Sequence, residues 1–437
     1  MTKTKPVPET LNDRENGVVR TTLDNGLTVL CKEMHHAPVA GLWLWYRVGS
    51  RNEVAGITGI SHWVEHMLFK GTPDFPQGEI DRRIAREGGT FNGMTWIDFT
   101  TYYETLPSER FDVALRLEAD RMVNSLFDPG EVASERTVII SEREGAENFP
   151  QFLLSEEVTS AAFKIHPYHH EVIGWKCDLE QITRDDLFNH YRTYYGPNNA
   201  ILVAAGDFRV EELLERIHEL YAPLTSGPPV SDLRSVESPQ QGERRVVVHG
   251  QGETAYVQIA HHAPRASDND FFPLVILDAV LSGAKAMSLW GSPPPNRSSR
   301  LYRALVNTEL AADASSSYSP TVDPYLFTCS ATVRTDRAIE EVEAALVTEL
   351  TRIVEEPISD DELAKAIQQS RAQFAYSSES VTNQGFWLGF AEVVASYEWF
   401  RDYLASLSSV TAADVQRVAQ AYLTLQNRTV GHYRPGR

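Results

Sequence analysis

His62-Trp63-Val64-Glu65-His66 lies within residues 57–69, whose apolar side chains recur at the spacing of a helix packed on a core. Residues four apart on a helix point to the same side and lie about 5–6 Å apart at Cβ, so the two imidazoles can reach one metal ion. Glu65 shares that face. The helix is predicted to end at residues 70–73, where Gly and Pro follow the apolar stripe.

The order His-x-x-Glu-His reverses the zincin motif and is typical of inverzincin zinc peptidases. Two histidines that merely face water are the alternative interpretation of so short a motif. The adjacent apolar stripe favours a metal, because polar groups beside a core need partners. Zinc in such a site needs a third protein ligand and an open fourth position for water.

A second helix is predicted to begin at Asp128, with Pro at the first helical position and Glu at the third. Glu135 and Glu142 are seven residues apart and project from one face of this helix. Spacing alone does not bring either carboxylate to the histidines, because acidic helix positions are commonly just solvated.

Several ordered motifs resemble the pitrilysin family of zinc peptidases, which includes insulin-degrading enzyme and the mitochondrial processing peptidase. The resemblance covers essentially the whole chain and is densest in residues 20–210. The motifs are Gly59-x-x-His62-x-x-Glu65-His66-Met67-Leu68-Phe69-Lys70-Gly71-Thr72, Gly88-Gly89-Thr90-Phe91-Asn92, Glu135-Arg136-x-Val138-x-x-x-Glu142, His166-Pro167-Tyr168, Val172-Ile173-Gly174, Tyr195-x-Pro197-Asn198-Asn199-Ala200 and Ala205-Gly206-Asp207.

The resemblance implies one zinc ion per chain, held by His62, His66 and Glu142. The family's third ligand is a glutamate 76 positions after the second histidine of the motif, which is Glu142 here. The resemblance also implies that Glu65 is the general base and that Glu135 supports the site without binding the metal. Such an ion retains positive charge and acidifies its bound water, whose proton Glu65 is expected to take and return to the leaving amine.

Residues 88–103 begin with a turn and continue rich in Thr and aromatic residues, which predicts a strand. In the family this strand lies at a sheet edge beside the zinc and pairs with extended substrate through main-chain hydrogen bonds. Asn92 and Gly93 match the family's Asn-Ala and follow Phe91, so these three residues are the predicted substrate contacts. Peptides or small unfolded proteins are the expected substrates.

The chain of 437 residues suits two domains of about 200 residues each. A strand pair joined by an Asn-Gly turn is predicted at 17–32 and a further strand at 41–48. The first half closes with a helix, an Asn-Asn pair and a strand at 200–205, and a similar order recurs from about residue 412 to 433.

This recurrence predicts an α+β fold of two homologous α/β-roll domains, each with a mostly antiparallel sheet flanked by helices. We expect an N-terminal zinc-carrying catalytic domain at 1–225, a linker at 226–243 and a C-terminal domain of similar fold at 244–437. The second half contains no His-x-x-Glu-His, so only the first copy is expected to bind metal.

Single-chain family members carry an Arg and a Tyr, seven apart, that help hold substrate and the tetrahedral intermediate. Leu305 and Ala312 occupy the matching positions here, and neither can donate a hydrogen bond to an oxyanion. Arg303 and Tyr318 lie nearby but out of register. We therefore expect this chain to be the zinc subunit of a heterodimer whose homologous partner supplies the missing pair, with a homodimer as the other arrangement.

A non-catalytic structural or interaction subunit is the alternative function, because some family members have become core proteins of respiratory complexes. Those proteins usually lose the metal residues. His62, Glu65, His66 and Glu142 are all present here, which favours the peptidase.

The net charge of −20 disfavours nucleic-acid binding, and no apolar run approaches the length of about 18 residues that spans a bilayer. An acidic protein could favour basic peptides, although many soluble proteins are simply acidic. Cys31, Cys177 and Cys329 are expected to be buried free thiols in a reducing compartment. The cytoplasm is the expected location, or the periplasm if a signal peptide is missing from this sequence.

Two further segments have open interpretations. The Gly-, Ser- and Pro-rich stretch 282–296 predicts a surface loop and resembles the glycine-rich loop of the non-catalytic processing-peptidase subunit, although an ordinary mobile loop is an equal alternative. His166, His169 and His170 are interpreted as turn residues rather than metal ligands, because Pro167 interrupts any helical register.

Overall fold

The computed structural model describes residues 11–13, 16–285 and 296–436, so most of the 282–296 loop lies outside the described residues. The described residues form two compact units. Unit 1 comprises the chain up to Arg143, Glu171–Arg234 and Glu379–Tyr397, and unit 2 comprises Glu144–His170, Ser235–Ser378 and Glu398 onward.

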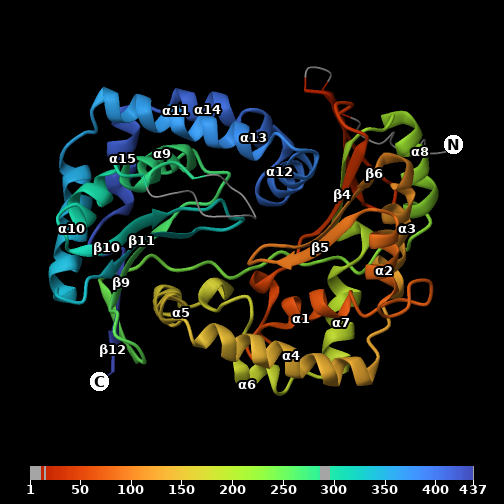
Figure 1. Ribbon diagram of the computed structural model, residues 1–437, viewed down its shortest axis with the longest axis horizontal. Coiled ribbons are helices and arrows are strands. Elements are labelled where there is room, and N and C mark those ends of the chain that lie inside the picture. Colours follow the sequence, from red (N-terminus) through yellow and green to blue (C-terminus); the bar gives the residue numbers. More distant parts are fainter. Residues whose placement is uncertain (1–10, 14–15, 286–295, 437) are drawn as a thin grey trace. The chain divides into compact units, whose positions relative to one another are not determined.

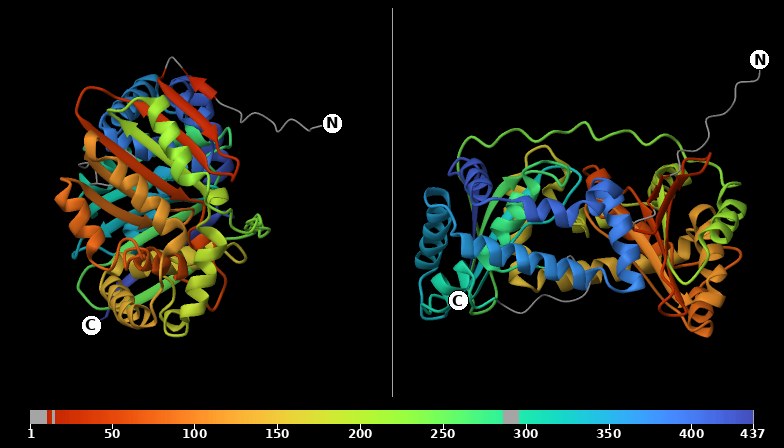
Figure 2. Two further views of the ribbon diagram at one scale, coloured as in Figure 1. Left: turned by 90° about the vertical axis from the view of Figure 1, so that its right-hand side faces the viewer. Right: turned by 90° about the horizontal axis from the view of Figure 1, so that it is seen from above.

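Unit 1 is built on a seven-stranded sheet in the order β1-β2-β3-β7-β4-β6-β5 (Figure 1). Its neighbouring strands are antiparallel except for the parallel pair β3 and β7. In the left view of Figure 2 its red, orange and yellow-green strands are seen side by side. The strands are β1 (Leu11–Asp13), β2 (Val18–Thr22), β3 (Thr28–Glu33), β4 (Val39–Tyr46), β5 (Thr90–Thr95), β6 (Thr100–Pro107) and β7 (Ala200–Gly206).

The predicted hairpin at 17–32 is confirmed as β2 and β3, and Gly26 at its turn has a φ of 93° that glycine adopts without strain. The expectation of one strand across 88–103 is wrong, because this segment forms the antiparallel pair β5 and β6. Its turn is closed by a hydrogen bond of 2.8 Å from the Trp96 N–H to the Phe99 carbonyl. The turn escaped prediction because it contains neither Gly nor Pro and keeps the aromatic composition of the strands.

Helices cover both faces of this sheet. Leu42, Leu44 and Tyr46 of β4 belong to a core that also contains residues of α1, α3, α7 and α8. Trp43 and Trp45 alternate with them and contact Phe386 and Phe390 of α12 on the other face. The helices of unit 1 are α1 (Ile60–Met67), α2 (Glu79–Arg86), α3 (Asp112–Asn124), most of α4 (Pro129–Glu147), α6 (Lys176–Leu179), α7 (Arg184–Tyr194), α8 (Val210–Tyr221) and α12 (Val381–Val394).

Unit 2 repeats this topology with a five-stranded sheet in the order β10-β11-β9-β12-β8. The parallel pair β8 and β12 corresponds to β3 and β7, and the remaining pairs are antiparallel. The predicted duplication of an α+β unit is thereby confirmed. The strands are β8 (Arg244–Gly250), β9 (Tyr256–Ala263), β10 (Ala311–Ser317), β11 (Tyr325–Val333) and β12 (Arg428–Pro435).

Each sequence half contributes a helix to the unit built mainly by the other half. Helix α12 follows β11 in sequence but packs on β4 and β7, whereas α5 precedes β8 but packs on β8, β9 and β12. The compact units differ from the predicted limits 1–225, 226–243 and 244–437 because each half contributes one helix to the other unit, and the limits of the sequence repeat stay a prediction. The helices of unit 2 are α5 (Pro150–Ala162), α9 (Phe271–Ser282), α10 (Ile339–Glu355), α11 (Asp360–Ser377), most of α13 (Tyr397–Arg401), α14 (Tyr403–Ser409) and α15 (Ala412–Tyr422).

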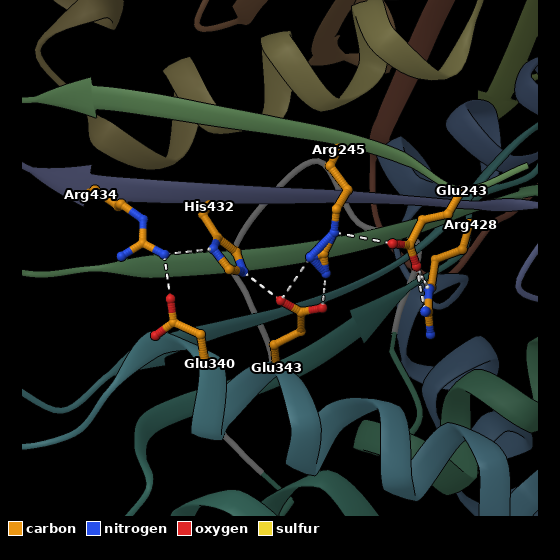
Figure 3. A network of polar contacts seen from close by, with 7 residues as sticks. All are labelled: Glu243, Arg245, Glu340, Glu343, Arg428, His432 and Arg434. Atoms are coloured by element: carbon orange, nitrogen blue, oxygen red, sulfur yellow. Dashed lines mark hydrogen bonds and ion pairs between the residues drawn. The ribbon is translucent and has the colours of Figure 1, made fainter.

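A chain of ionic contacts links α10 to β8 and β12 in unit 2 (Figure 3). Glu343 of α10 lies between Arg245 and His432, whose Nε2 is 2.7 Å from the carboxylate. Arg434 pairs with Glu340 on the same helix. These contacts join α10 to the neighbouring strands β8 and β12, with Glu343 linking Arg245 to the buried His432.

The described helices and thiols settle two expectations from the sequence. Among the helices in the described part of the chain, none combines the length and apolar character that a bilayer crossing requires. Cys31 and Cys329 are buried free thiols as expected, but Cys177 is exposed, so that expectation is wrong for this residue. Cys177 lies on α6, whose buried residues are Asp178 and Leu179, so its side chain lies on the exposed side of this helix.

Two glycines allow α12 to approach the sheet closely. A Cβ added to Gly385 would lie 2.3 Å from the Trp43 ring, and one added to Gly389 would lie 2.0 Å from the Trp45 ring. Both indoles are fully buried, so neither can move aside without disturbing the core. The absence of a side chain at these two positions is therefore a packing requirement.

Gly389→Ala should lower the free energy of unfolding by about 1–3 kcal/mol, because overpacking outweighs the higher helix propensity of Ala. Gly145→Ala on α4 is the matched control, because nothing lies within 4 Å of its added Cβ. Urea unfolding measures both variants. Equal stability of the two would contradict this account of the α12 contact.

Candidate metal centre

Helix α1 carries the His-x-x-Glu-His motif, and its start is fixed by a side chain from the preceding loop. Its N-cap is Gly59, which has no side chain to satisfy the first N–H groups. The buried carboxylate of Glu53 accepts hydrogen bonds from the N–H of Gly59 at 2.7 Å and of Ser61 at 2.8 Å. Burial raises the pKa of Glu53 to about 7, and its ionised form also complements the helix dipole.

A second carboxylate fixes the turn before α1. Asp178 accepts hydrogen bonds from the N–H groups of Gly56 and Thr58, each at 3.1 Å, and from the Thr58 hydroxyl at 2.7 Å. Gly59 itself has a φ of 86°, a conformation that favours glycine. Together these contacts determine where the first turn of α1, and hence His62, is placed.

The structure brings His62, His66 and Glu142 together. Their ligand atoms all lie within 4.8 Å of one another, the only such group found among the described residues. The Nε2 atom of His66 is 3.7 Å, and that of His62 is 4.0 Å, from Oε2 of Glu142 on α4. The ring centroids of His62 and His66 are 4.6 Å apart. Two helices distant in sequence therefore supply one cluster.

The surroundings of both imidazoles favour a ring nitrogen with a free lone pair, which a metal ligand requires. Burial lowers the pKa of His62 to about 3, so this ring is neutral at ordinary pH. Nδ1 of His66 lies 2.8 Å from Glu135 Oε1, which places the proton on Nδ1 and leaves Nε2 free to face Glu142. Metal ligands must be deprotonated, and two imidazoles with one carboxylate form a donor set of catalytic zinc sites. These three residues could therefore hold zinc.

Glu135 lies behind His66 and does not belong to the ligand group. Burial raises its pKa, but hydrogen bonds from Lys70 and His66 outweigh that effect and hold the pKa below its usual value. Its second oxygen forms an ion pair with Lys70. This arrangement agrees with the supporting role that the sequence resemblance implies.

Glu65 projects from the same helix and is 8% exposed. Burial raises the pKa of its carboxyl group, hydrogen bonds from Thr95 lower it in part, and the nearby Glu142 raises it further. Its backbone carbonyl accepts a hydrogen bond of 3.4 Å from the Tyr102 hydroxyl. A carboxylate with a raised pKa next to a metal-ligand group suits a residue that accepts and returns a proton.

The predicted substrate contacts lie on β5, which is an edge strand of the unit 1 sheet. Asn92 is exposed, whereas the Phe91 ring is half-buried and lies 5.8 Å from the Phe69 ring. A Cβ at Gly93 would lie 2.9 Å from the rings of Phe69 and Tyr102. This close approach disfavours any larger residue at position 93.

Several predicted residues lie elsewhere. His166 and His169 border or lie in a short 3-10 turn, Pro167–His169, which agrees with their interpretation as turn residues. Leu305 is buried and Ala312 is exposed on β10, and neither side chain can donate a hydrogen bond. The Tyr318 hydroxyl donates to the Pro264 carbonyl at 2.6 Å.

Sequence reasoning assigned no role to Glu53, Asp178 or Lys70. Lys70 lies within the motif that spans Gly59 to Thr72, but only the structure shows that its partner is the Glu135 carboxylate. Glu53 and Asp178 act on backbone N–H groups, and such contacts leave no spacing pattern in a single sequence. The one available signal in the sequence was glycine at the N-cap position, Gly59. A glycine N-cap cannot accept hydrogen bonds from the first N–H groups of the helix, so another residue must do so.

The fold and the site define a duplicated α+β protein with a metal-ligand group in its first copy. Residues 28–175 match the family model described as Insulinase (Peptidase family M16), and residues 181–370 match the Peptidase M16 inactive domain. The chain belongs to this M16 family of insulinase- and pitrilysin-like proteins, which confirms the resemblance found in the sequence.

Individual relatives extend the similarity over more than nine-tenths of the chain. The zinc protease PqqE of Helicobacter pylori is 28% identical over 424 residues, covering 95% of this chain and 92% of that protein. The probable mitochondrial-processing peptidase subunit beta of Arabidopsis thaliana is 25% identical, covering 92% and 76%. The crystal structure of a protease from Helicobacter pylori superposes with a TM-score of 0.89 at 27% identity, covering 98% of this chain and all of that one.

The first turn of α1 is also tied to α7 by a buried histidine. Ser61 donates to the Gly49 carbonyl at 3.1 Å, so the imidazole of His190 must donate from Nε2 to the Ser61 hydroxyl, also at 3.1 Å. Burial lowers the pKa of His190 from 6.5 to about 3. Between these pH values the unfolded chain binds a proton that the folded chain does not, so folding weakens as the pH falls.

His190→Gln keeps an N–H donor for Ser61 but removes this titration. The dependence of the free energy of unfolding on pH should become shallower by about 1.4 kcal/mol per pH unit between roughly pH 4 and pH 6. Urea unfolding at several pH values measures the slope for both proteins. An unchanged slope would show that His190 does not remain neutral in the folded state.

Proposed function

We propose that this chain is a zinc metalloendopeptidase that cleaves peptides bound in extended form at the free edge of β5. The observation that carries the proposal is the convergence of His62, His66 and Glu142 within 4.8 Å, from two separate helices. The names of relatives, a zinc protease and a processing-peptidase subunit, support the same function.

Zinc held by these three residues would polarise a peptide carbonyl and acidify a water molecule. Glu65 would accept the proton of that water and deliver it to the leaving amine, for which its raised pKa is suited. Glu135 would hold His66 in the orientation that directs Nε2 to the metal. The edge of β5 that has no neighbouring strand among the described residues would bind the substrate main chain, with Phe91, Asn92 and Gly93 beside it.

A non-catalytic subunit remains the second candidate, because residues 181–370 match a model described as an inactive domain. That match covers only part of the first copy and continues into the second, whereas residues 28–175 match the insulinase model and contain the whole ligand group. A subunit without metal-dependent chemistry would not require two imidazoles and a carboxylate within reach of one ion. The preserved group favours the peptidase.

Zinc binding is the first expected result. The chain should bind one zinc ion, and zinc at about 100 times its Kd should raise the free energy of unfolding by about 2.7 kcal/mol. His66→Ala should lose both effects, whereas His218→Ala, an exposed position on α8, should keep them. Elemental analysis and urea unfolding with and without zinc measure this. Equal zinc content in both variants would contradict the ligand assignment.

Glu65→Gln should retain zinc but lose peptide hydrolysis by a factor of about 10²–10⁴, because the amide cannot accept the proton from water. Glu211→Gln, at an exposed site on α8, is the matched control and should keep its activity. A chelator-sensitive peptide assay at equal zinc content compares them. Full activity of Glu65→Gln would refute its role as the base.

We further propose that this chain works with a second subunit. The positions that supply an Arg and a Tyr in single-chain family members hold Leu305 and Ala312, and the Tyr318 hydroxyl already bonds to a carbonyl. Loss of a transition-state hydrogen-bond donor costs a factor of about 10²–10³ in rate. A homologous chain, or a second copy of this one, could supply such donors.

The isolated monomer should therefore hold zinc yet hydrolyse peptides at least about 100-fold more slowly than the assembly purified from the native host. Size-exclusion chromatography with light scattering gives the composition, and the peptide assay gives the rate. A monomer as active as the native assembly would exclude the two-chain proposal. It would leave the assignment of the metal ligands intact.

A further inference from the structure

We infer that Lys70 is a positioning residue for His66, acting through Glu135, an inference that rests on the proposed zinc-peptidase function. Lys70 follows the end of α1, where its backbone N–H donates to the Met67 carbonyl at 3.0 Å. Its side chain is 26% exposed and forms an ion pair with Oε2 of Glu135 on α4. The contact thus joins the end of the metal helix to the helix that carries Glu142.

Glu135 connects two partners through different oxygen atoms. Oε1 lies 2.8 Å from Nδ1 of His66, and Oε2 contacts the Lys70 ammonium. A carboxylate held at both oxygens cannot rotate about its terminal bond without losing one partner. Its plane is therefore fixed, and the hydrogen bond from His66 fixes the imidazole in turn.

The burial of Glu135 gives this ion pair more weight than a surface pair. The Glu135 side chain is 6% exposed, whereas exposed ion pairs contribute little because water competes with them. Removal of the ammonium would leave a buried carboxylate oxygen without its cationic partner. The carboxylate would then turn or draw in water, and His66 would lose its fixed orientation toward the metal.

An ordinary structural tie between α1 and α4 is the competing explanation. Such a tie would change the free energy of unfolding of the zinc-free protein and leave the zinc affinity of the folded state unaltered. A positioning role instead changes the zinc affinity, and it does so only while Glu135 is present to transmit the effect. The two explanations therefore differ in a measurable quantity.

The test is the zinc Kd, measured by competition with a chelator on the full chain. Lys70→Met should weaken zinc binding by about 10-fold, the lower end of the range for residues behind metal ligands. Lys70→Arg should restore most of it, because the guanidinium also donates to a carboxylate. Lys32→Met is the matched control, since Lys32 is a partly buried lysine of β3 that bonds to Gln384 at 3.0 Å. Its zinc affinity should not change.

A double-mutant cycle separates the two explanations. In the Glu135→Gln background, Lys70→Met should cause no further loss of zinc affinity. An unchanged Kd in Lys70→Met, or the same 10-fold loss without Glu135, would overturn the inference and leave the zinc-peptidase proposal standing. Failure of the unsubstituted chain to bind zinc would overturn both. Lys70→Gln serves as the second uncharged variant if Lys70→Met does not fold.

Discussion

The packing of α1 against the unit 1 sheet is the constraint on which the site depends. Ile60, Trp63, Val64 and Met67 are buried in the core, so the helix cannot rotate about its axis. The remaining face then presents His62, Glu65 and His66 in one direction. Glu53 holds the start of the helix, and the Lys70–Glu135 contact holds the residue beyond its end. Apolar burial sets the orientation, and buried polar contacts set the position along the axis.

The two copies of the fold share their sheet topology. They differ in the residues on the helix that follows β4 in the first copy and β9 in the second. In the first copy this helix is α1 with its ligand group, whereas in the second it is α9, whose buried Asp278 contacts Lys285 at 2.7 Å. In the second copy the buried carboxylate of Asp278 is therefore paired with the ammonium of Lys285. The two copies thus share a scaffold, while the His62, His66 and Glu142 group lies in the first copy.

Much of the site could be predicted from the sequence because local patterns encode it. Apolar spacing places His62 and His66 on one helical face, and the capping residues place the start of α4 at Pro129. Glu142 was beyond local reasoning, because its approach to the histidines depends on the packing of two helices distant in sequence. Only the family resemblance identified it beforehand, and the structure places it within reach.

The features that escaped prediction involve contacts between distant residues. Helix α12 packs on β4, some 340 residues earlier in the chain, and the sequence analysis assigned no role to this helix. Gly385 and Gly389 acquire meaning only beside the two tryptophans. The β5–β6 turn lacks a Gly or Pro signal, and Cys177 lies on the exposed side of α6, whose buried residues are Asp178 and Leu179.

X-ray absorption spectroscopy of the zinc-loaded protein reports the atoms bound to the metal and thereby tests the ligand assignment itself. Binding by His62, His66 and Glu142 predicts two imidazole nitrogens at about 2.0–2.1 Å and carboxylate or water oxygen at about 2.0–2.2 Å. His62→Ala and His66→Ala should each remove one imidazole from that spectrum. Sulfur ligands, or a spectrum unchanged by both substitutions, would contradict this ligand assignment.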